Sequence, residues 1–107
     1  MNTLEGLYEV VLDRKAHGEE GSYTRYLFEQ GLDKILKKCG EESAEMIIAA
    51  KNGEKPELIG EISDLIYHML VMMAETGVPL TDVLDELERR RQKIGNLKTF
   101  HQVDRES

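Results

Sequence analysis

Two short acidic stretches contain the residues best suited to chemistry. Glu41, Glu42 and Glu45 lie in the first, and Glu61 and Asp64 lie in the second. Residues three or four apart are neighbours on a helix surface, so each stretch can direct a pair of carboxylates to one side of a helix. Four converging negative charges repel one another unless a cation lies between them. All-oxygen ligation favours a hard divalent ion, which we expect to be Mg²⁺, with Mn²⁺ as an alternative.

The segment between the two stretches predicts how they meet. Asn52, Gly53 and Pro56 form a short connection between two helical patterns, so the two helices should be antiparallel neighbours. Glu45 precedes Asn52 by seven residues, and Glu61 follows Pro56 by five. At about 1.5 Å of rise per residue, both carboxylates should lie at a similar height above the turn. The two acidic pairs can therefore face each other.

Helical patterns account for most of the 107 residues, and strand-like alternation is absent. We expect an all-α fold of four to five helices, with an antiparallel helical hairpin at its centre. The helices should cover about 3–15, 23–30, 32–51 and 56–76, followed by one that is capped by Thr81 and closed by Gly95. Residues 1–95 should form a single domain. Residues 96–107 should form a polar tail, from which Phe100 can pack onto the bundle.

The two long helices differ in their expected burial. The packing side of the 32–51 helix is expected to contain Leu32, Ile35, Leu36, Cys39, Ser43, Met46, Ile47 and Ala50. The 56–76 helix is apolar on nearly all sides, which indicates burial on nearly all sides. In so small a domain, we expect it to pack against a second subunit, so that homodimerisation completes the bundle. Buried Glu61 and Asp64 would then need a metal or a partner, unless they lie in exposed first turns that favour acids.

Composition and charge exclude several classes of partner. The net charge of −7 argues against nucleic acid and against an anionic membrane, because the chain has no overall basic field. The longest apolar-rich stretch, 65–74, is too short to span a bilayer. The N-terminus has no pattern of a signal peptide. The single cysteine, Cys39, excludes an internal disulfide and fits a reducing cytoplasm.

Other catalytic patterns are absent from the sequence. It has no recognisable Ser/His/Asp spacing, no glycine-rich phosphate loop and no dinucleotide fingerprint. A di-iron bundle would need Glu-x-x-His motifs, but none of the three histidines follows a glutamate at that spacing. A Mg²⁺ site made of carboxylates usually binds substrate phosphates and activates water, so a phosphate-containing substrate is expected.

The acidic pattern also carries a family resemblance. Glu41-Glu42-x-x-Glu45 followed by Glu61-x-x-Asp64 resembles the signature of the all-α nucleoside triphosphate pyrophosphohydrolase superfamily. Within it, the segments 22–24, 37–45, 49–53, 64–68 and 83–90 resemble the phosphoribosyl-ATP pyrophosphatases of histidine biosynthesis. The resemblance extends from about residue 4 to residue 91.

This resemblance implies an activity and assigns roles to residues. The expected reaction is Mg²⁺-dependent hydrolysis between the α and β phosphates of phosphoribosyl-ATP, giving phosphoribosyl-AMP and pyrophosphate. It is the second step of histidine biosynthesis, and the enzymes are dimers. Either Glu41 or Glu42 would orient the attacking water or accept its proton. The metal would be held by Glu42, Glu45, Glu61 and Asp64, and the substrate would be contacted by Lys37, Lys38, Lys51, Asn52 and Tyr23.

Two other functions remain open at this point. A general pyrophosphatase for (d)NTPs would share the metal site and differ in the pocket for the base and sugar. A helical interaction module without catalysis would carry the same acids as a solvated surface.

Overall fold

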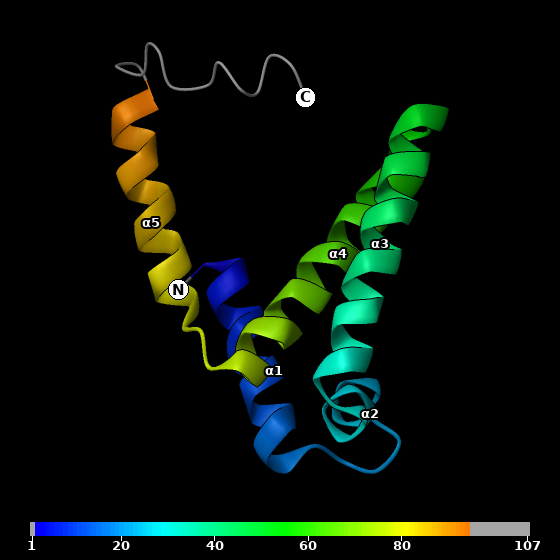
Figure 1. The fold of residues 1–107 in the computed structure, drawn as a ribbon, viewed down its shortest axis with the longest axis vertical. Coiled ribbons are helices and arrows are strands. Elements are labelled where there is room, and N and C mark those ends of the chain that lie inside the picture. The colour runs from blue at the N-terminus through cyan, green and yellow to red at the C-terminus, as the bar shows by residue number, and fades with distance from the viewer. Residues whose placement is uncertain (1, 95–107) are drawn as a thin grey trace.

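The computed structural model describes residues 2–94 and contains five α-helices over them (Figure 1). They are α1 (Thr3–His17), α2 (Tyr23–Gln30), α3 (Leu32–Asn52), α4 (Lys55–Thr76) and α5 (Leu80–Lys93). The expected all-α class is confirmed, and the described part of the chain contains no strand. Gly95, Phe100 and the expected 96–107 tail lie outside the described residues, so the domain limit at residue 95 stays a prediction.

Local capping explains where some of these helices begin and end. Asn2 and Glu5 form a capping box, in which Asn2 Oδ1 accepts from the Glu5 amide at 2.8 Å. Ser22 caps α2 by accepting from the Arg25 amide at 3.2 Å. Gly53 ends α3 with a φ of 75°, a conformation that favours glycine.

The predicted cap at Thr81 is wrong. The N-cap residue lies two positions earlier, at extended Pro79, and helix α5 begins at Leu80. The carbonyl of Pro79 accepts from the Asp82 amide at 3.1 Å. Leu80 is buried in the core, so packing sets the start of this helix and prevails over the capping preference of the threonine.

Helices α3 and α4 form an antiparallel hairpin, and the other helices gather at its open end (Figure 1). Helix α1 packs on α4, while α2 packs on α1, α3 and α4. The core lies at this end of the hairpin. It consists of Tyr8, Val11, Leu27, Ile35, Leu70, Val71, Met73, Ala74 and Leu80.

The seam between α3 and α4 follows a spacing of seven residues along α3. Its buried residues are Ile35, Glu42 and Ala49. A repeat of seven keeps residues on one face of helices that cross at a shallow angle. The expected packing side is therefore wrong in part. Ile35 is buried, but a glutamate occupies the middle of the seam, and four of the expected residues are exposed: Leu32, Leu36, Ile47 and Ala50.

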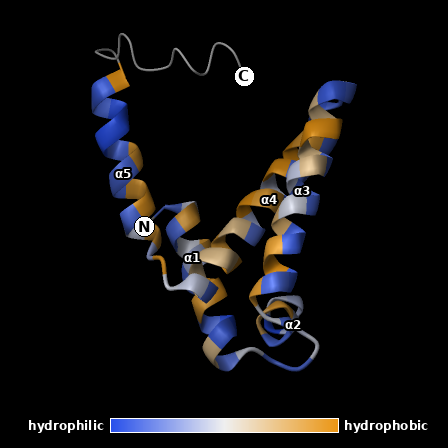
Figure 2. Ribbon diagram, viewed as in Figure 1, coloured by the Kyte–Doolittle hydropathy of each residue, from blue (hydrophilic) through white to orange (hydrophobic). Residues whose placement is uncertain are grey.

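The turn end of the hairpin projects beyond the core. Hydrophobic residues continue along this projecting part (Figure 2), and Ile47, Ile48 and Ile59 are each more than half exposed. The buried residues of α4 begin only at His68, so burial of α4 on nearly all sides is wrong for the single chain. The radius of gyration is 16.3 Å, against about 13 Å for a globular domain of this length. No described helix is both long and apolar enough to cross a membrane.

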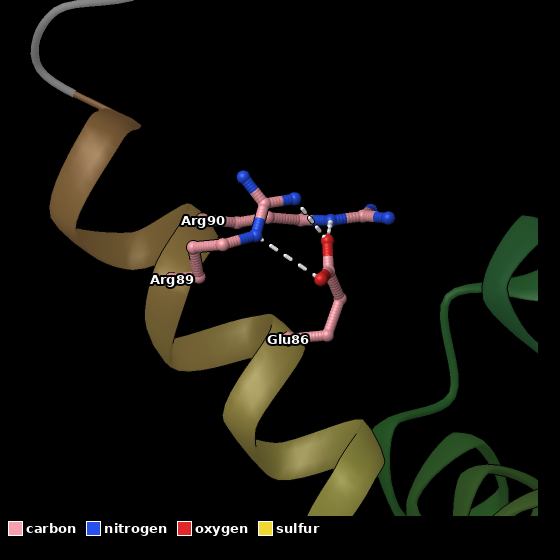
Figure 3. Close-up of polar contacts among 3 residues, drawn as sticks. All are labelled: Glu86, Arg89 and Arg90. Carbon is pink, nitrogen blue, oxygen red and sulfur yellow. Dashed lines mark hydrogen bonds and ion pairs between the residues drawn. The ribbon is translucent and has the colours of Figure 1, made fainter.

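Helix α5 leaves the core soon after it begins. Leu80 is buried, Val83 and Leu84 pack beside it, and the rest of the helix forms a separate arm of a V-shaped molecule (Figure 1). On this arm, the Glu86 carboxylate accepts from Nε of Arg89 at 3.1 Å and from Nε of Arg90 at 2.8 Å (Figure 3). These hydrogen bonds lower the pKa of Glu86 to about 2.

We expect the two arginines to change the pKa of Glu86 more than they change the stability of the fold. A lowered pKa stabilises the fold above the pH at which an unfolded glutamate titrates, about 4.3. The contribution is lost as the pH falls through about 2. Because the groups are exposed, solvent and salt screen the contribution. NMR titration should give a Glu86 pKa near 2, rising towards its ordinary value in R89A/R90A, while the melting temperature at pH 7 changes by about 2 °C at most. A loss of many degrees would contradict this view of α5.

Candidate metal site

The hairpin brings three of the predicted ligands together. Carboxylate oxygens of Glu42, Glu45 and Glu61 lie within 4.8 Å of one another. Glu42 is buried in the seam, Glu61 is half-buried and Glu45 is exposed. Two residues come from α3 and one from α4, at the matched height above the turn that the sequence indicates. The arrangement is therefore open to solvent on one side and closed on the other.

The buried oxygens of this cluster lack partners. Oε2 of Glu42 and Oε2 of Glu61 are buried, and neither has a hydrogen-bond donor among the described residues. Buried carboxylate oxygens without a donor are costly, so such atoms usually mark a bound ion or water. A divalent cation between the three carboxylates would supply the missing partner. The oxygen-only donor set fits Mg²⁺ or Mn²⁺.

Lys38 lies beside this cluster on α3. Its Nζ is 3.5 Å from Oε1 of Glu42 and 3.6 Å from Oε1 of Glu41. Burial lowers the pKa of Lys38, but Tyr23, Glu42 and Glu41 together hold the pKa above its ordinary value. Lys38 therefore carries its charge at neutral pH. One ammonium leaves the cluster negative overall and places a cation where phosphate oxygens could bind.

Asp64 does not join the cluster. It lies on α4 about one turn beyond Glu61 and is exposed, which is one of the two placements that the sequence left open. Asp64 is exposed because this part of α4 extends beyond the core, and only the side facing α3 is covered. Its role as a ligand stays a prediction.

The remaining predicted contacts lie at different places on α3. At about 100° per residue, Lys37 and Lys51 point about 140° and 180° away from Glu42 around the helix, and both are exposed. Asn52 lies on the side of Glu45, about 10 Å further along the axis. Lys38 is thus the lysine beside the acidic cluster, while roles for the other three residues stay predictions.

Sequence reasoning missed a polar cluster around His68. The Tyr23 hydroxyl lies 2.9 Å from His68 Nε2, and His68 Nδ1 lies 2.7 Å from the Asp64 carbonyl. Next to it, Thr24 Oγ1 is hydrogen-bonded to the Tyr67 hydroxyl. A histidine inside an apolar helix was the available signal. Its partner could not be named because Tyr23 is 45 residues away in the chain.

An all-α hairpin with carboxylates from both helices and a lysine at their edge fits the class of helical pyrophosphohydrolases. A model of the family described as phosphoribosyl-ATP pyrophosphohydrolase matches residues 4–91. The chain is 57% identical over 98 residues to the phosphoribosyl-ATP pyrophosphatase of Clostridium novyi, covering 92% of this chain and 89% of that protein. For the protein of the same name from Pelotomaculum thermopropionicum, identity is 60% over 90 residues, covering 84% of this chain and 92% of that protein.

A longer relative shows the same domain in another setting. The histidine biosynthesis bifunctional protein HisIE of Thermoanaerobacter pseudethanolicus is 61% identical over 83 residues, which make up 78% of this chain and 38% of that protein. The chain belongs to the phosphoribosyl-ATP pyrophosphohydrolase family.

We expect Mg²⁺ to stabilise the protein through this cluster. A ligand that binds only the folded state raises the melting temperature with concentration, so millimolar Mg²⁺ should raise that of the wild type. In E61Q one buried oxygen no longer carries charge, and the shift should largely disappear. The matched control is E57Q, four residues earlier on α4 and exposed, which should keep the shift. Equal Mg²⁺-dependent shifts of the melting temperature in E61Q and the wild type would show that Glu61 is not a ligand. The variant D64N tests Asp64 in the same way.

Proposed function

We propose that this chain hydrolyses phosphoribosyl-ATP to phosphoribosyl-AMP and pyrophosphate, the second step of histidine biosynthesis. The observation that carries the proposal is the cluster of Glu42, Glu45 and Glu61 with its unpartnered buried oxygens, in a chain of this family. The cytoplasm is the proposed compartment, since the family is biosynthetic and the chain has a single cysteine.

The proposed chemistry divides among the residues by position. Glu42, Glu45 and Glu61, with Asp64 at the outer edge, would hold Mg²⁺. When bound, this ion would offset the negative charge of the triphosphate and lower the pKa of water. Lys38 would meet phosphate oxygens at the rim of the cluster.

Hydrolysis requires one bond to form and one to break. A water oxygen bonds to the α phosphorus as the bond from that phosphorus to the bridging oxygen breaks, and pyrophosphate leaves with the bridging oxygen. One proton of the water passes to a base. Glu41 and Glu42 are the candidates that the family resemblance offers, and both lie beside the Lys38 ammonium at the edge of the cluster. Glu42 is buried and Glu41 is exposed, so Glu41 is the residue that can release the proton to bulk water.

Removing one charge from the cluster should abolish turnover without unfolding the chain. In E45Q the carboxylate becomes a neutral amide of similar size, and Glu45 is exposed, so its packing is not needed for the fold. We expect the rate of pyrophosphate release to fall by about 100-fold or more. Mutation of residues that only hydrogen-bond to metal ligands already lowers metal affinity or activity by about 10- to 100-fold. EDTA should have the same effect on the wild type, and circular dichroism should stay helical. Full activity in E45Q or in EDTA would contradict the proposed site.

The choice of substrate needs a separate measurement. Steady-state rates on phosphoribosyl-ATP, dUTP, dCTP and ATP should favour phosphoribosyl-ATP by a wide margin. A preference for a simple dNTP would support a general pyrophosphatase. No pyrophosphate release from any of them, with Mg²⁺ present, would support the non-catalytic interaction module.

We also infer that the active form is a homodimer. The exposed aliphatic side chains on the projecting half of the hairpin include Ile47, Ile48, Ile59 and Ile62. Exposed apolar patches of this kind mark interaction surfaces. A second copy offers the same apolar face, and a helical pair needs a further layer to enclose a core. Pairing two projecting hairpins would bury both faces and account for the extended shape.

Charge on the projecting hairpin should dissociate this dimer. The variant I47D/I59D places one carboxylate on each helix, at positions that are 62% and 65% exposed. The matched control is V10D/L12D on α1, where the side chains are 45% and 42% exposed. Sedimentation equilibrium should give a dimer for the wild type and the control and a monomer for I47D/I59D. A wild-type monomer, or dissociation of the control alone, would overturn the assigned surface.

A further inference from the structure

Two exposed tyrosines line a hollow that the proposed chemistry does not use. Tyr23 and Tyr26 lie three residues apart on α2, and they are 46% and 41% exposed. The hollow beside them has a volume of about 630 Å³, which is within the range of small-molecule pockets. Its charged lining residues are Glu20, Arg25 and Glu29. It therefore combines two aromatic rings with a small set of charges.

The two rings form a stack whose position is fixed. Their centroids lie 6.1 Å apart, with 25° between the ring planes. Tyr67 of α4 lies 6.2 Å from the Tyr23 ring at an angle of 31°. The Tyr23 hydroxyl is hydrogen-bonded to His68 Nε2 at 2.9 Å, which holds the ring against α4. Tyr23 and Tyr26 thus form a tyrosine platform onto which a further planar ring can stack.

The charges around the tyrosine platform do not favour a phosphate group. Arg25 Nε donates to the Glu29 carboxylate at 3.2 Å, and its Nη1 donates to the Gly18 carbonyl at 3.2 Å. With Glu29 offset by this arginine, Glu20 leaves the lining with an excess of one negative charge. A phosphate would be repelled here. A positively charged ring would be attracted by the carboxylate and by the faces of the tyrosines.

The tyrosine platform lies at a distance from the acidic cluster that a nucleoside can span. His68, to which Tyr23 is hydrogen-bonded, is seven residues from Glu61 on α4. Seven residues are close to two helical turns, so both side chains lie on one face of α4, about 10 Å apart along its axis. With the phosphates of a nucleotide at Glu61, the base of the same molecule can reach Tyr23.

We propose that the tyrosine platform stacks on the base of the substrate and selects a base that carries a positive charge. In phosphoribosyl-ATP the second ribose is attached to N1 of adenine. An adenine substituted at N1 is a basic amidine that is protonated at neutral pH, whereas the base of ATP is neutral. This proposal rests on the proposed function. It assigns the predicted substrate contact of Tyr23 to the face of its ring and adds Tyr26 as a second contact.

Removal of one ring tests the tyrosine platform in turnover. Y26L removes the aromatic face, and the matched control Y26F keeps it. We expect the KM for phosphoribosyl-ATP to rise about tenfold in Y26L, because stacking on one aromatic side chain contributes about that factor. The KM for ATP should rise less, and kcat should change less than KM. Y26F should keep the wild-type KM, and a wild-type KM in Y26L would overturn the proposal.

A binding measurement separates this proposal from the enzymatic assignment. The probes are 1-methyl-AMP, whose base is protonated, and AMP, whose base is neutral. In calorimetric titrations at pH 7 with Mg²⁺, 1-methyl-AMP should bind the wild type about tenfold more tightly than AMP, and Y26L should lose most of this preference. In NMR spectra 1-methyl-AMP should shift the ring signals of Tyr26 and leave those of Tyr8, which is buried in the core, unchanged.

A charge variant tests the selection of a positive base. E20Q should weaken the binding of 1-methyl-AMP by about threefold and leave that of AMP unchanged, since an exposed charge contributes little. The matched control is E19Q, which has the same net charge but changes a residue outside the lining of the hollow. A wild type without turnover of phosphoribosyl-ATP would overturn the proposed function. Equal affinities for AMP and 1-methyl-AMP, or unshifted Tyr26 signals, would overturn the role of the tyrosine platform.

Discussion

The burial of one carboxylate in the seam of the hairpin is the constraint on which the other features depend. Glu42 takes the central position of a line whose other members are Ile35 and Ala49. An apolar residue there would stabilise the contact between α3 and α4 more simply. A charged one is acceptable only if its oxygens find partners, and Lys38 reaches only one of them. The same position thus links the stability of the hairpin to whatever occupies the acidic cluster.

The chain separates its stable part from its chemical part along the length of the hairpin. The core lies where α1, α2 and the start of α5 meet the open end of α3 and α4. The acidic cluster lies further towards the turn, where neighbouring isoleucines are exposed. Residues near the cluster can therefore change with little loss of core packing, which suits a site that must accept charged ligands. In the proposed dimer, a second copy would cover this half.

Helix α2 depends on the rest of the fold for its position. It is only eight residues long, too short to be stable alone, and tertiary contacts must hold it. Leu27 fixes it in the core, and hydrogen bonds from Tyr23 and Thr24 fix its first turn to α4. A short helix near the N-terminus is in this way held by residues more than 40 positions further along the chain.

The sequence by itself determined the helices, the hairpin and the meeting of three acids. Helical periodicity is local, and the short connection at Asn52 and Gly53 leaves α3 and α4 few alternatives to antiparallel packing. Glu42, Glu45 and Glu61 could therefore be placed together by counting residues from the turn. The family followed from the same motifs.

Only the tertiary structure decided which side of each helix is covered. Hydrophobicity predicts the wrong burial for Ile47 and Glu42. The seam follows a spacing of seven residues, which buries the glutamate and leaves the isoleucine exposed. Asp64 is exposed because the hairpin extends past its core. The pairing of Tyr23 with His68 depends on how α2 docks onto α4, which no spacing along the chain encodes. The local periodicity of the sequence determines which residues share a face of a helix, whereas contacts between distant segments determine which face is buried.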